Sequence, residues 1–110
     1  MNMLASVVPE LVAEVERAMT SGGRGELAPL LASGVIERCT CDASADAGYI
    51  YLVRPAQSLH FAKLAVQVAE TIPFLESGFN VDVDHDGYVY GIEILSRADV
   101  FSKLRDANAL

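Results

Sequence analysis

Four acidic residues in the second half of the chain have the spacing of a calcium-binding loop. The segment reads DVDHDGYVYGIE over residues 82–93, and its acidic positions are Asp82, Asp84, Asp86 and Glu93. Gly87 stands sixth, where an EF-hand loop turns sharply. Calcium takes six to eight oxygen ligands, and three aspartates with a bidentate glutamate would supply most of them. These four carboxylates are therefore the candidate cation site of the sequence.

The same segment has the pattern of a β-hairpin. Three apolar residues alternate with polar ones before the turn, namely Phe79, Val81 and Val83, and large apolar residues recur at every second position over residues 88–94. The Asp-Gly pair at 86–87 is a strong short-range signal for a hairpin turn. An EF-hand needs a helix on each side, whereas residues 71–81 contain Pro73 and Gly78 and many β-formers. The sequence therefore predicts a hairpin, with calcium binding as the alternative.

The length of the turn decides which side chains share a face. A two-residue turn pairs Val83 with Tyr90, and a four-residue turn pairs it with Tyr88. Both put the large apolar residues except Val89 on one face. A three-residue turn would set the valines opposite Val89 and Gly91, and we reject it because it divides the apolar residues between the faces.

The composition indicates a single domain over residues 1–110. The chain is 52% hydrophobic and 21% charged, with a net charge of −7. Its eight Lys and Arg residues are scattered, so we expect no nucleic-acid partner. There is no apolar run of membrane-spanning length and no signal-peptide pattern at the start, and two cysteines are too few for a disulfide framework. We therefore expect no membrane partner and a cytoplasmic location.

The apolar pattern along the chain predicts an α+β fold. Residues 1–34 read as an extension with two helices, at 6–23 and 25–33; strands are expected at 35–41, 49–53, about 64–74 and in the two arms of the hairpin; and a helix follows from residue 96. Ser96 and Asp99 resemble a capping box at the start of that helix. Residues 35–110 should thus form a small antiparallel sheet of about five strands, with one C-terminal helix.

Period-two alternation divides the residues of each predicted strand between the two faces of the sheet. In the strand at 35–41, alternation puts Ile36 with Arg38 and Thr40 on one face. The four tyrosines are Tyr49, Tyr51, Tyr88 and Tyr90. We expect them to pack in the core beneath the N-terminal and C-terminal helices. If the helices leave them uncovered, they form a partner or dimer surface instead, because Tyr is enriched at interfaces.

Three segments resemble the YuzE-like family of small, mostly bacterial proteins of unknown function. They are CDASADAGYIYL, VAETI and FNVDVDHDGYVYGIEIL, of which residues 45–50, 68–71 and 82–95 fit the family pattern. The resemblance covers about residues 41–103. The insertion RPAQSLHFAKLA and residues 1–34 depart from it. It implies an α+β domain without an established activity or agreed catalytic residues, and an antitoxin-like binding role at the level of the family.

The remaining chemistry-bearing residues do not assemble into a motif. Cys39 and Cys41 lack zinc spacing and should be buried, inert thiols. The only histidines, His60 and His85, stand in no catalytic motif, and Gly23-Arg24-Gly25 follows a helix rather than a strand. Surface acids such as Glu70 and Asp46 would act as an acid–base pair only if burial shifted their pKa. We therefore assign no catalytic, cofactor-binding or metal-binding residue.

The sequence leaves three functional hypotheses. The first is a non-enzymatic binding or interaction module that binds a protein partner, an antitoxin-like partner or itself. The second is a calcium-binding protein that uses the acidic residues of the loop at 82–93. The third is an enzyme with carboxylate chemistry, which has the least support.

Overall fold

A computed structural model describes residues 2–53 and 68–110, and these residues form an α+β fold as predicted. The strands are β1 (Asn2–Met3), β2 (Val35–Asp42), β3 (Ala47–Leu52), β4 (Val68–Phe74), β5 (Phe79–Asp84) and β6 (Val89–Leu95). The helices are α1 (Leu4–Val7), α2 (Pro9–Ser21), α3 (Ala28–Ala32) and α4 (Ala98–Asp106), with short 3-10 helices at Gly25–Leu27 and Leu75–Ser77. The described strands make one antiparallel sheet in the order β1-β2-β3-β6-β5-β4.

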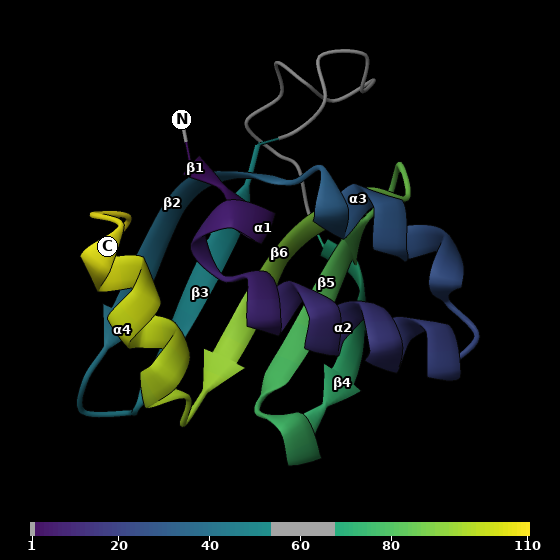
Figure 1. Ribbon diagram of the computed structural model, residues 1–110. Helices are drawn as coiled ribbons and strands as arrows, with labels where there is room; N and C mark the ends of the chain where they lie inside the picture. Colours follow the sequence, from purple (N-terminus) through teal and green to yellow (C-terminus); the bar gives the residue numbers. More distant parts are fainter. Residues whose placement is uncertain (1, 54–67) are drawn as a thin grey trace.

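All four α-helices lie on the same side of this sheet (Figure 1). The core fills the space between them. Its helix-side residues are Leu4, Val8, Leu11, Val12, Val15, Met19, Leu27, Leu31, Val100, Phe101 and Leu104, and its strand residues are Ile36, Ile50, Leu52, Phe79, Val81, Val83, Val89, Ile92 and Ile94. The N-terminal segment therefore shares one core with the sheet. The fold buries one face of the sheet and leaves the other without a described helix.

Helix α2 follows from local sequence signals. Pro9 occupies the first turn, where its missing N–H is not needed by the helix. Leu11, Val12, Val15 and Met19 form the buried stripe. The helix ends at Gly22, whose N–H donates to the Ala18 carbonyl. The predicted helices at 6–23 and 25–33 are confirmed, with a break at Val8 that separates α1 from α2.

Helix α4 buries the expected residues but starts differently from the prediction. The N-cap is Arg97, without a side-chain cap, so the capping box between Ser96 and Asp99 is wrong. The Arg97 guanidinium donates instead to the Asp99 carboxylate at 2.9–3.0 Å, to Glu14 of α2 at 2.8 Å and to the Ser77 carbonyl at 2.8 Å. Arg97 thereby joins α4 to α2 and to the turn after β4.

Two strand features differ from the simple alternating pattern. Asn2 and Met3 pair with Ile36 and Val35, which adds an edge strand that the sequence did not predict. In β2 a bulge between Ile36 and Arg38 turns Ile36 toward the core, so the prediction that it shares a face with Arg38 is wrong. An extra residue in a strand reverses the face of every side chain beyond it.

The hairpin between β5 and β6 is confirmed, but its register corrects the prediction. Asp84 N–H donates to the Tyr88 carbonyl and Gly87 N–H donates to the Asp84 carbonyl, which defines a three-residue turn. Gly87 has a φ of +85°, a conformation that glycine adopts without strain. Val83 therefore pairs with Val89, the register that we rejected.

A bulge in β6 explains why this turn does not divide the core. Val81 pairs with Ile92 and Val83 pairs with Val89, so β6 contains one more residue than β5 in this interval. The bulge lets Val89 join Ile92 and Ile94 in the core, and it turns Tyr90 to the opposite face. The apolar side chains of β6 that face the core are therefore Val89, Ile92 and Ile94, and not the set that includes Tyr90, on which the two-residue and four-residue turns were based.

Strand β4 is the edge strand beside β5, a position that suits Pro73 because proline has no N–H to donate to a further strand. The structure describes it from Val68 to Phe74. The part of the predicted strand before residue 68, together with His60, lies outside the described residues.

Candidate functional site

The face of the sheet opposite the helices carries two rows of polar and aromatic residues, which we call the open face. One row runs through Arg38, Tyr51, Gly91, Asp82 and Thr71, which are Cα partners across β2, β3, β6, β5 and β4. The second row runs through Thr40, Tyr49, Glu93, Asn80 and Pro73 on the same strands. Tyr90 joins them from the β6 bulge. No described helix packs on this face (Figure 1).

Three tyrosine rings form the centre of the open face. The ring centroids of Tyr49 and Tyr51 are 4.5 Å apart, and Tyr90 lies 6.3 Å from Tyr49 and 6.0 Å from Tyr51 in edge-on contacts. Such separations are within the range of favourable aromatic pairs. The prediction that the tyrosines pack beneath the helices is wrong for these three, because the helices lie on the other face. All three are half-buried.

Tyr49 reaches across β6 because Gly91 has no side chain. A Cβ at Gly91 would overlap the Tyr49 ring and lie 2.6 Å from the Ile50 carbonyl oxygen. The Tyr49 hydroxyl donates to Asp82 Oδ2 at 2.5 Å, and the Thr71 hydroxyl donates to Asp82 Oδ1 at 2.6 Å. This chain of side chains connects β3, β5 and β4 over the open face.

The environment of Tyr49 keeps its hydroxyl protonated. Burial, and then the hydrogen bond to the Asp82 carboxylate, raise the pKa of Tyr49 far above its usual value. Both carboxylate oxygens of Asp82 therefore accept from hydroxyl donors on the open face.

The two sides of the open face carry opposite charges. On β2, the Arg38 guanidinium lies 3.7 Å from the centroid of the Tyr51 ring, a cation–π contact. On β5 and β6 lie Asp82 and Glu93, and Glu93 accepts from the Asn80 amide at 2.8 Å. The arrangement suits the recognition of another surface, since tyrosine and arginine dominate the energetics of many interfaces.

The structure does not gather the four carboxylates of the candidate calcium loop into one group. Asp82 and Glu93 lie in different rows of the open face with the partners described above. Asp84 is buried, 4% exposed, and its carboxylate accepts from the backbone N–H groups of Asp86 and Tyr88. The flanking elements are strands rather than helices. Among the described residues no three acidic, histidine or cysteine side chains form a group that could hold a metal.

The other predicted residues are dispersed. Cys39 is half-buried, and burial raises its pKa to about 11, whereas Cys41 is exposed, which corrects the expectation that both are buried. His85 is exposed at the turn of the hairpin. Glu70 accepts from Arg24 at 2.8 Å, and Asp46 lies in the β2–β3 turn with a φ of +51°. These residues share no site with one another.

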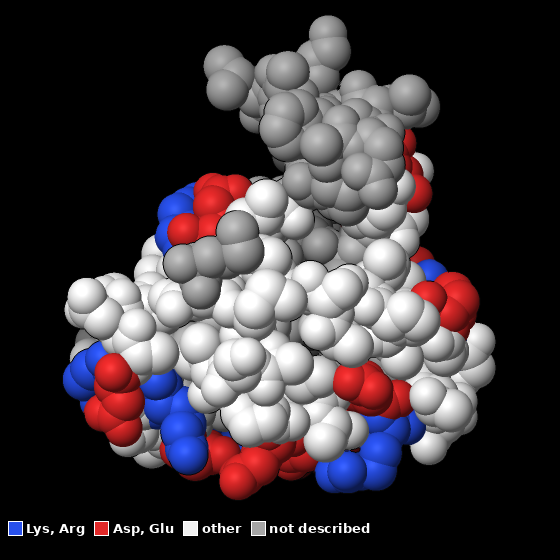
Figure 2. Space-filling view, turned by 45° about the horizontal axis from the view of Figure 1, so that its top comes forward, with Lys and Arg blue, Asp and Glu red and all other residues white. Residues whose placement is uncertain are grey.

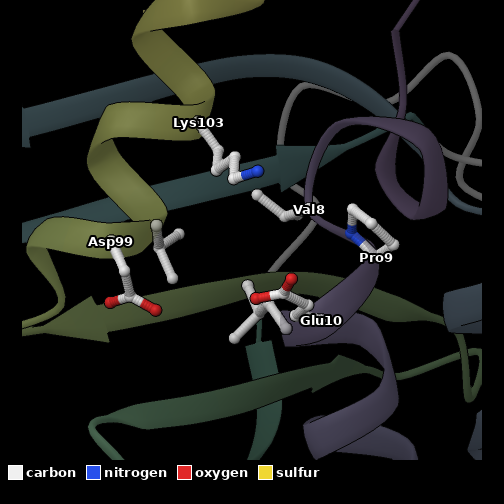
Figure 3. A pocket seen from close by; sticks show the side chains of 7 residues that line it. Val8, Pro9, Glu10, Asp99 and Lys103 are labelled. Carbon is white, nitrogen blue, oxygen red and sulfur yellow. The ribbon is translucent and has the colours of Figure 1, made fainter.

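A small pocket lies between the start of α2 and α4 (Figure 3). Val8, Pro9 and Glu10 line it from the start of α2, and Asp99 and Lys103 line it from α4. Its volume is about 40 Å³, which has room for a few water molecules and not for a metabolite. It gives no reason to place a catalytic site between the helices.

The charged groups on the face seen in Figure 2 are mixed rather than gathered. Lys and Arg atoms occur there in separate groups, each beside Asp or Glu atoms. Among the described residues, no helix has the length and apolar character needed to cross a membrane.

Three of the four tyrosines lie on the open face, whereas the sequence predicted that they pack on the face beneath the helices. The sequence of β3 did indicate the face of two of these tyrosines. Tyr49 and Tyr51 alternate with Ile50 and Leu52, and aliphatic side chains are more often buried in a core than tyrosine is. Tyr90 carried no such signal, because its face depends on the bulge.

No protein-family model, no curated protein and no solved structure matches this chain.

Proposed function

We propose that this protein is a non-enzymatic interaction module that binds a protein partner through the open face. The observation that carries the proposal is the cluster of Tyr49, Tyr51 and Tyr90, with Arg38 stacked on it, on a sheet face that no described helix covers. A face that only met water would more commonly carry small and charged side chains than three contacting tyrosines.

The rim of the open face also suits binding. Arg38, Thr40, Thr71 and Pro73 are exposed around the half-buried tyrosines. A partly desolvated aromatic centre with a polar rim is the arrangement found in protein interfaces. The hydrogen bonds of Tyr49, Thr71 and Asn80 hold the centre in place before binding, which lowers the entropy cost of association.

The resemblance to the YuzE-like pattern belongs to this proposal. It includes residues 45–50 and 82–95, which contribute Tyr49, Asp82, Tyr90 and Glu93 to the open face. An antitoxin-like role in the cytoplasm, in which the chain occupies the surface of a second protein, is one form that the proposed binding could take.

Site-specific photo-cross-linking in cells of the source organism tests the proposal. Replacement of Tyr51 by p-benzoylphenylalanine keeps an aromatic ring on the open face and makes it reactive toward a bound protein. We expect one discrete cross-linked species from position 51. The matched control replaces Ser102, which is exposed on α4 on the other side of the sheet, and should give none.

A second cross-linking position on the open face shows whether a missing cross-link at position 51 reflects the absence of a partner. Thr40 lies at the β2 side of the open face and is exposed, so the same photoreactive residue fits there without displacing the tyrosines. If neither position 51 nor position 40 gives a species that the control lacks, the open face binds no protein and the proposal is wrong.

A further inference from the structure

The charges on the open face are arranged so that the face is complementary to itself. Arg38 lies on β2, and Asp82 and Glu93 lie on β5 and β6, with the tyrosines of β3 and β6 between them. A surface with separate positive and negative sides can bind a rotated copy of itself. The inference that follows rests on the proposed function, because it names the partner of the open face.

One row of Cα partners sets the geometry. Arg38, Tyr51, Gly91 and Asp82 succeed one another across four neighbouring strands. Neighbouring strands lie about 4.8 Å apart, so the backbones of Arg38 and Asp82 are separated by about 14 Å along this row. The midpoint of the row falls between β3 and β6, beside the tyrosine cluster.

We infer that the partner is a second copy of this chain, packed sheet against sheet around a twofold axis that is parallel to the strands and passes between β3 and β6. This axis exchanges the two ends of the row, so Arg38 of each copy lies opposite Asp82 of the other. A twofold axis in the same plane but perpendicular to the strands would place the acidic strands against each other. The distribution of charge therefore selects the first orientation.

The Arg38 guanidinium of one copy and the Asp82 carboxylate of the other can form an ion pair across this interface. The Arg38 side chain is 55% exposed, and its Nε lies 3.7 Å from the carboxylate of Glu37, which is itself 57% exposed. This exposed ion pair and the stacking on Tyr51 leave the two terminal amino groups of the guanidinium for a second carboxylate. The described residues place hydroxyl donors, and no cation, on Asp82. At the axis, Tyr51 of one copy lies opposite Gly91 of the other, where the Tyr49 ring forms the surface.

The size of the open face indicates a weak dimer. Five strands about 4.8 Å apart, each contributing about five residues at 3.3 Å per residue, present a projected area of about 400 Å² per copy. The total for two copies, about 800 Å², is below the roughly 1,200–2,000 Å² of stable interfaces and falls among weak, transient ones. Each chain also has a net charge of −7, which opposes association. We expect dissociation in the micromolar range, on the order of 1–100 μM.

Sedimentation velocity of the full chain over a wide concentration range tests the inference. We expect the mass to rise from 11.8 kDa toward twice that value with increasing concentration. Arg38→Glu should raise the dissociation constant at least about tenfold, since both Arg38–Asp82 pairs become repulsive. The matched control is Arg17→Glu, which makes the same charge change at an exposed position of α2 and should leave the dissociation constant within about twofold of wild type.

A mixing experiment identifies the paired residues. Asp82→Lys makes the reciprocal change, so it should also dissociate the dimer when alone. An equimolar mixture of Arg38→Glu and Asp82→Lys chains restores both attractive pairs and should regain the dimer as a heterodimer. If Asp82→Lys does not give a folded circular-dichroism spectrum, Thr71→Lys supplies the cation at the neighbouring exposed position.

Three results would overturn the inference. The first is a wild-type chain that stays monomeric up to millimolar concentration. The second is a dimer that Arg38→Glu weakens no more than Arg17→Glu does, and the third is a mixture that stays monomeric. The photo-cross-linking experiment separates the two proposals. A cross-link from position 51 to a different protein would support the proposed function and exclude a second copy of the chain as the partner. If no cross-linked species formed, both the proposed function and the dimer would be wrong.

Discussion

Arg97 is the residue that ties the C-terminal helix to the rest of the fold. Its side chain is 19% exposed and donates to Glu14, Asp99 and the Ser77 carbonyl. We expect Arg97→Gln to lower the free energy of unfolding by about 2 kcal/mol, because charge-assisted hydrogen bonds from a mostly buried donor are lost. Urea denaturation at neutral pH measures this change. A loss below about 0.5 kcal/mol, the level of an ordinary surface substitution, would contradict the role assigned to Arg97.

The same contact predicts a dependence of stability on pH. The hydrogen bond from Arg97 is the main cause that lowers the pKa of Asp99 below its usual value of 3.8. A group with a depressed folded pKa stabilises the protein above its unfolded pKa, and this contribution is lost as the pH falls through the folded pKa. The stability difference between wild type and Arg97→Gln should therefore shrink from about pH 5 downward. A difference that stays constant to pH 3 would show that Asp99 is not part of the contact in solution.

Tyr49 combines a structural hydrogen bond with a place at the centre of the open face. Tyr49→Phe removes one of the two donors to Asp82 and should cost about 1–2 kcal/mol. The matched control is Tyr51→Phe, since the Tyr51 hydroxyl has no hydrogen-bond partner among the described residues. Chemical denaturation of the two variants gives the comparison, and equal losses would contradict the Tyr49–Asp82 contact.

Burial of Tyr49 should also appear in alkaline titration. Its pKa is raised, so its contribution to stability is complete below the unfolded pKa near 10 and is lost as the pH rises through the folded value. In an ultraviolet titration of tyrosinate, one tyrosine should ionise only when the protein unfolds. The Tyr49→Phe variant should lack this late step, and its persistence in that variant would assign it to another residue.

At the scale of elements, the β6 bulge builds the open face. It sends Tyr90 to the tyrosine cluster and keeps Val89 in the core, while Gly91 beside it gives Tyr49 its path to Asp82. Gly91→Ala should cost about 2–3 kcal/mol, because the new Cβ meets both the Tyr49 ring and the Ile50 carbonyl.

Two further variants test this explanation of Gly91. Gly91→Ala combined with Tyr49→Ala should lose less stability than the sum of the two single changes, because the clash with the ring is removed. Gly91→Ala should still be destabilising in the Tyr49→Ala background, because the contact with the backbone of Ile50 persists. Gly25→Ala is the control, since its Cβ would meet only ordinary contacts at 3.6 Å or more. If thermal unfolding showed that Gly25→Ala and Gly91→Ala lower the unfolding temperature equally, the contact of a Cβ at Gly91 with the Tyr49 ring and the Ile50 carbonyl would be contradicted.

The turn between β5 and β6 predicts the outcome of calcium titration. Asp84 is engaged with the backbone of its own turn, and Asp82 accepts from Tyr49 and Thr71 on the open face. Bringing Asp82, Asp84 and Glu93 around one ion would require breaking the β5–β6 pairing. We expect calorimetry with calcium to give no heat above dilution at millimolar concentrations. A saturable heat with a rise in the unfolding temperature would restore the calcium hypothesis.

Much of this organisation could be predicted from local patterns, and the missing part has a physical cause. The stripe of Leu11, Val15 and Met19 and the turn at Gly87 specify a helix and a hairpin through short-range chemistry. A bulge depends on long-range packing, and one extra residue exchanges the faces of all that follow, so counting by twos misplaced Ile36 and Tyr90. Tyr90 was thus misassigned for the same reason that the hairpin register was, whereas Tyr49 and Tyr51 lie in a strand whose alternation is regular.

At the scale of the whole molecule, the fold divides the sheet into two faces with different roles. The helices cover the face with Ile50, Val81 and Ile92, and the core there accounts for folding. The opposite face holds the tyrosine cluster and the separated charges, which the core does not need. Substitutions at Arg38 or Thr40 should therefore change association more than stability, whereas changes at Val15 or Leu104 should do the reverse.

The central claim is that the open face of the sheet is exposed to water in a single chain, and the most direct test measures this exposure. The measurement is nuclear magnetic relaxation of threonine and valine methyl groups in the presence of a soluble gadolinium chelate, at the lowest workable concentration or in the Arg38→Glu variant. Thr40 and Thr71, at opposite sides of the open face, should relax as fast as Thr20, which is exposed on α2, while the buried Val15 methyl groups should be unaffected. If Thr40 and Thr71 were instead as protected as Val15, the open face would be covered within the single chain, and the proposed binding surface would not exist.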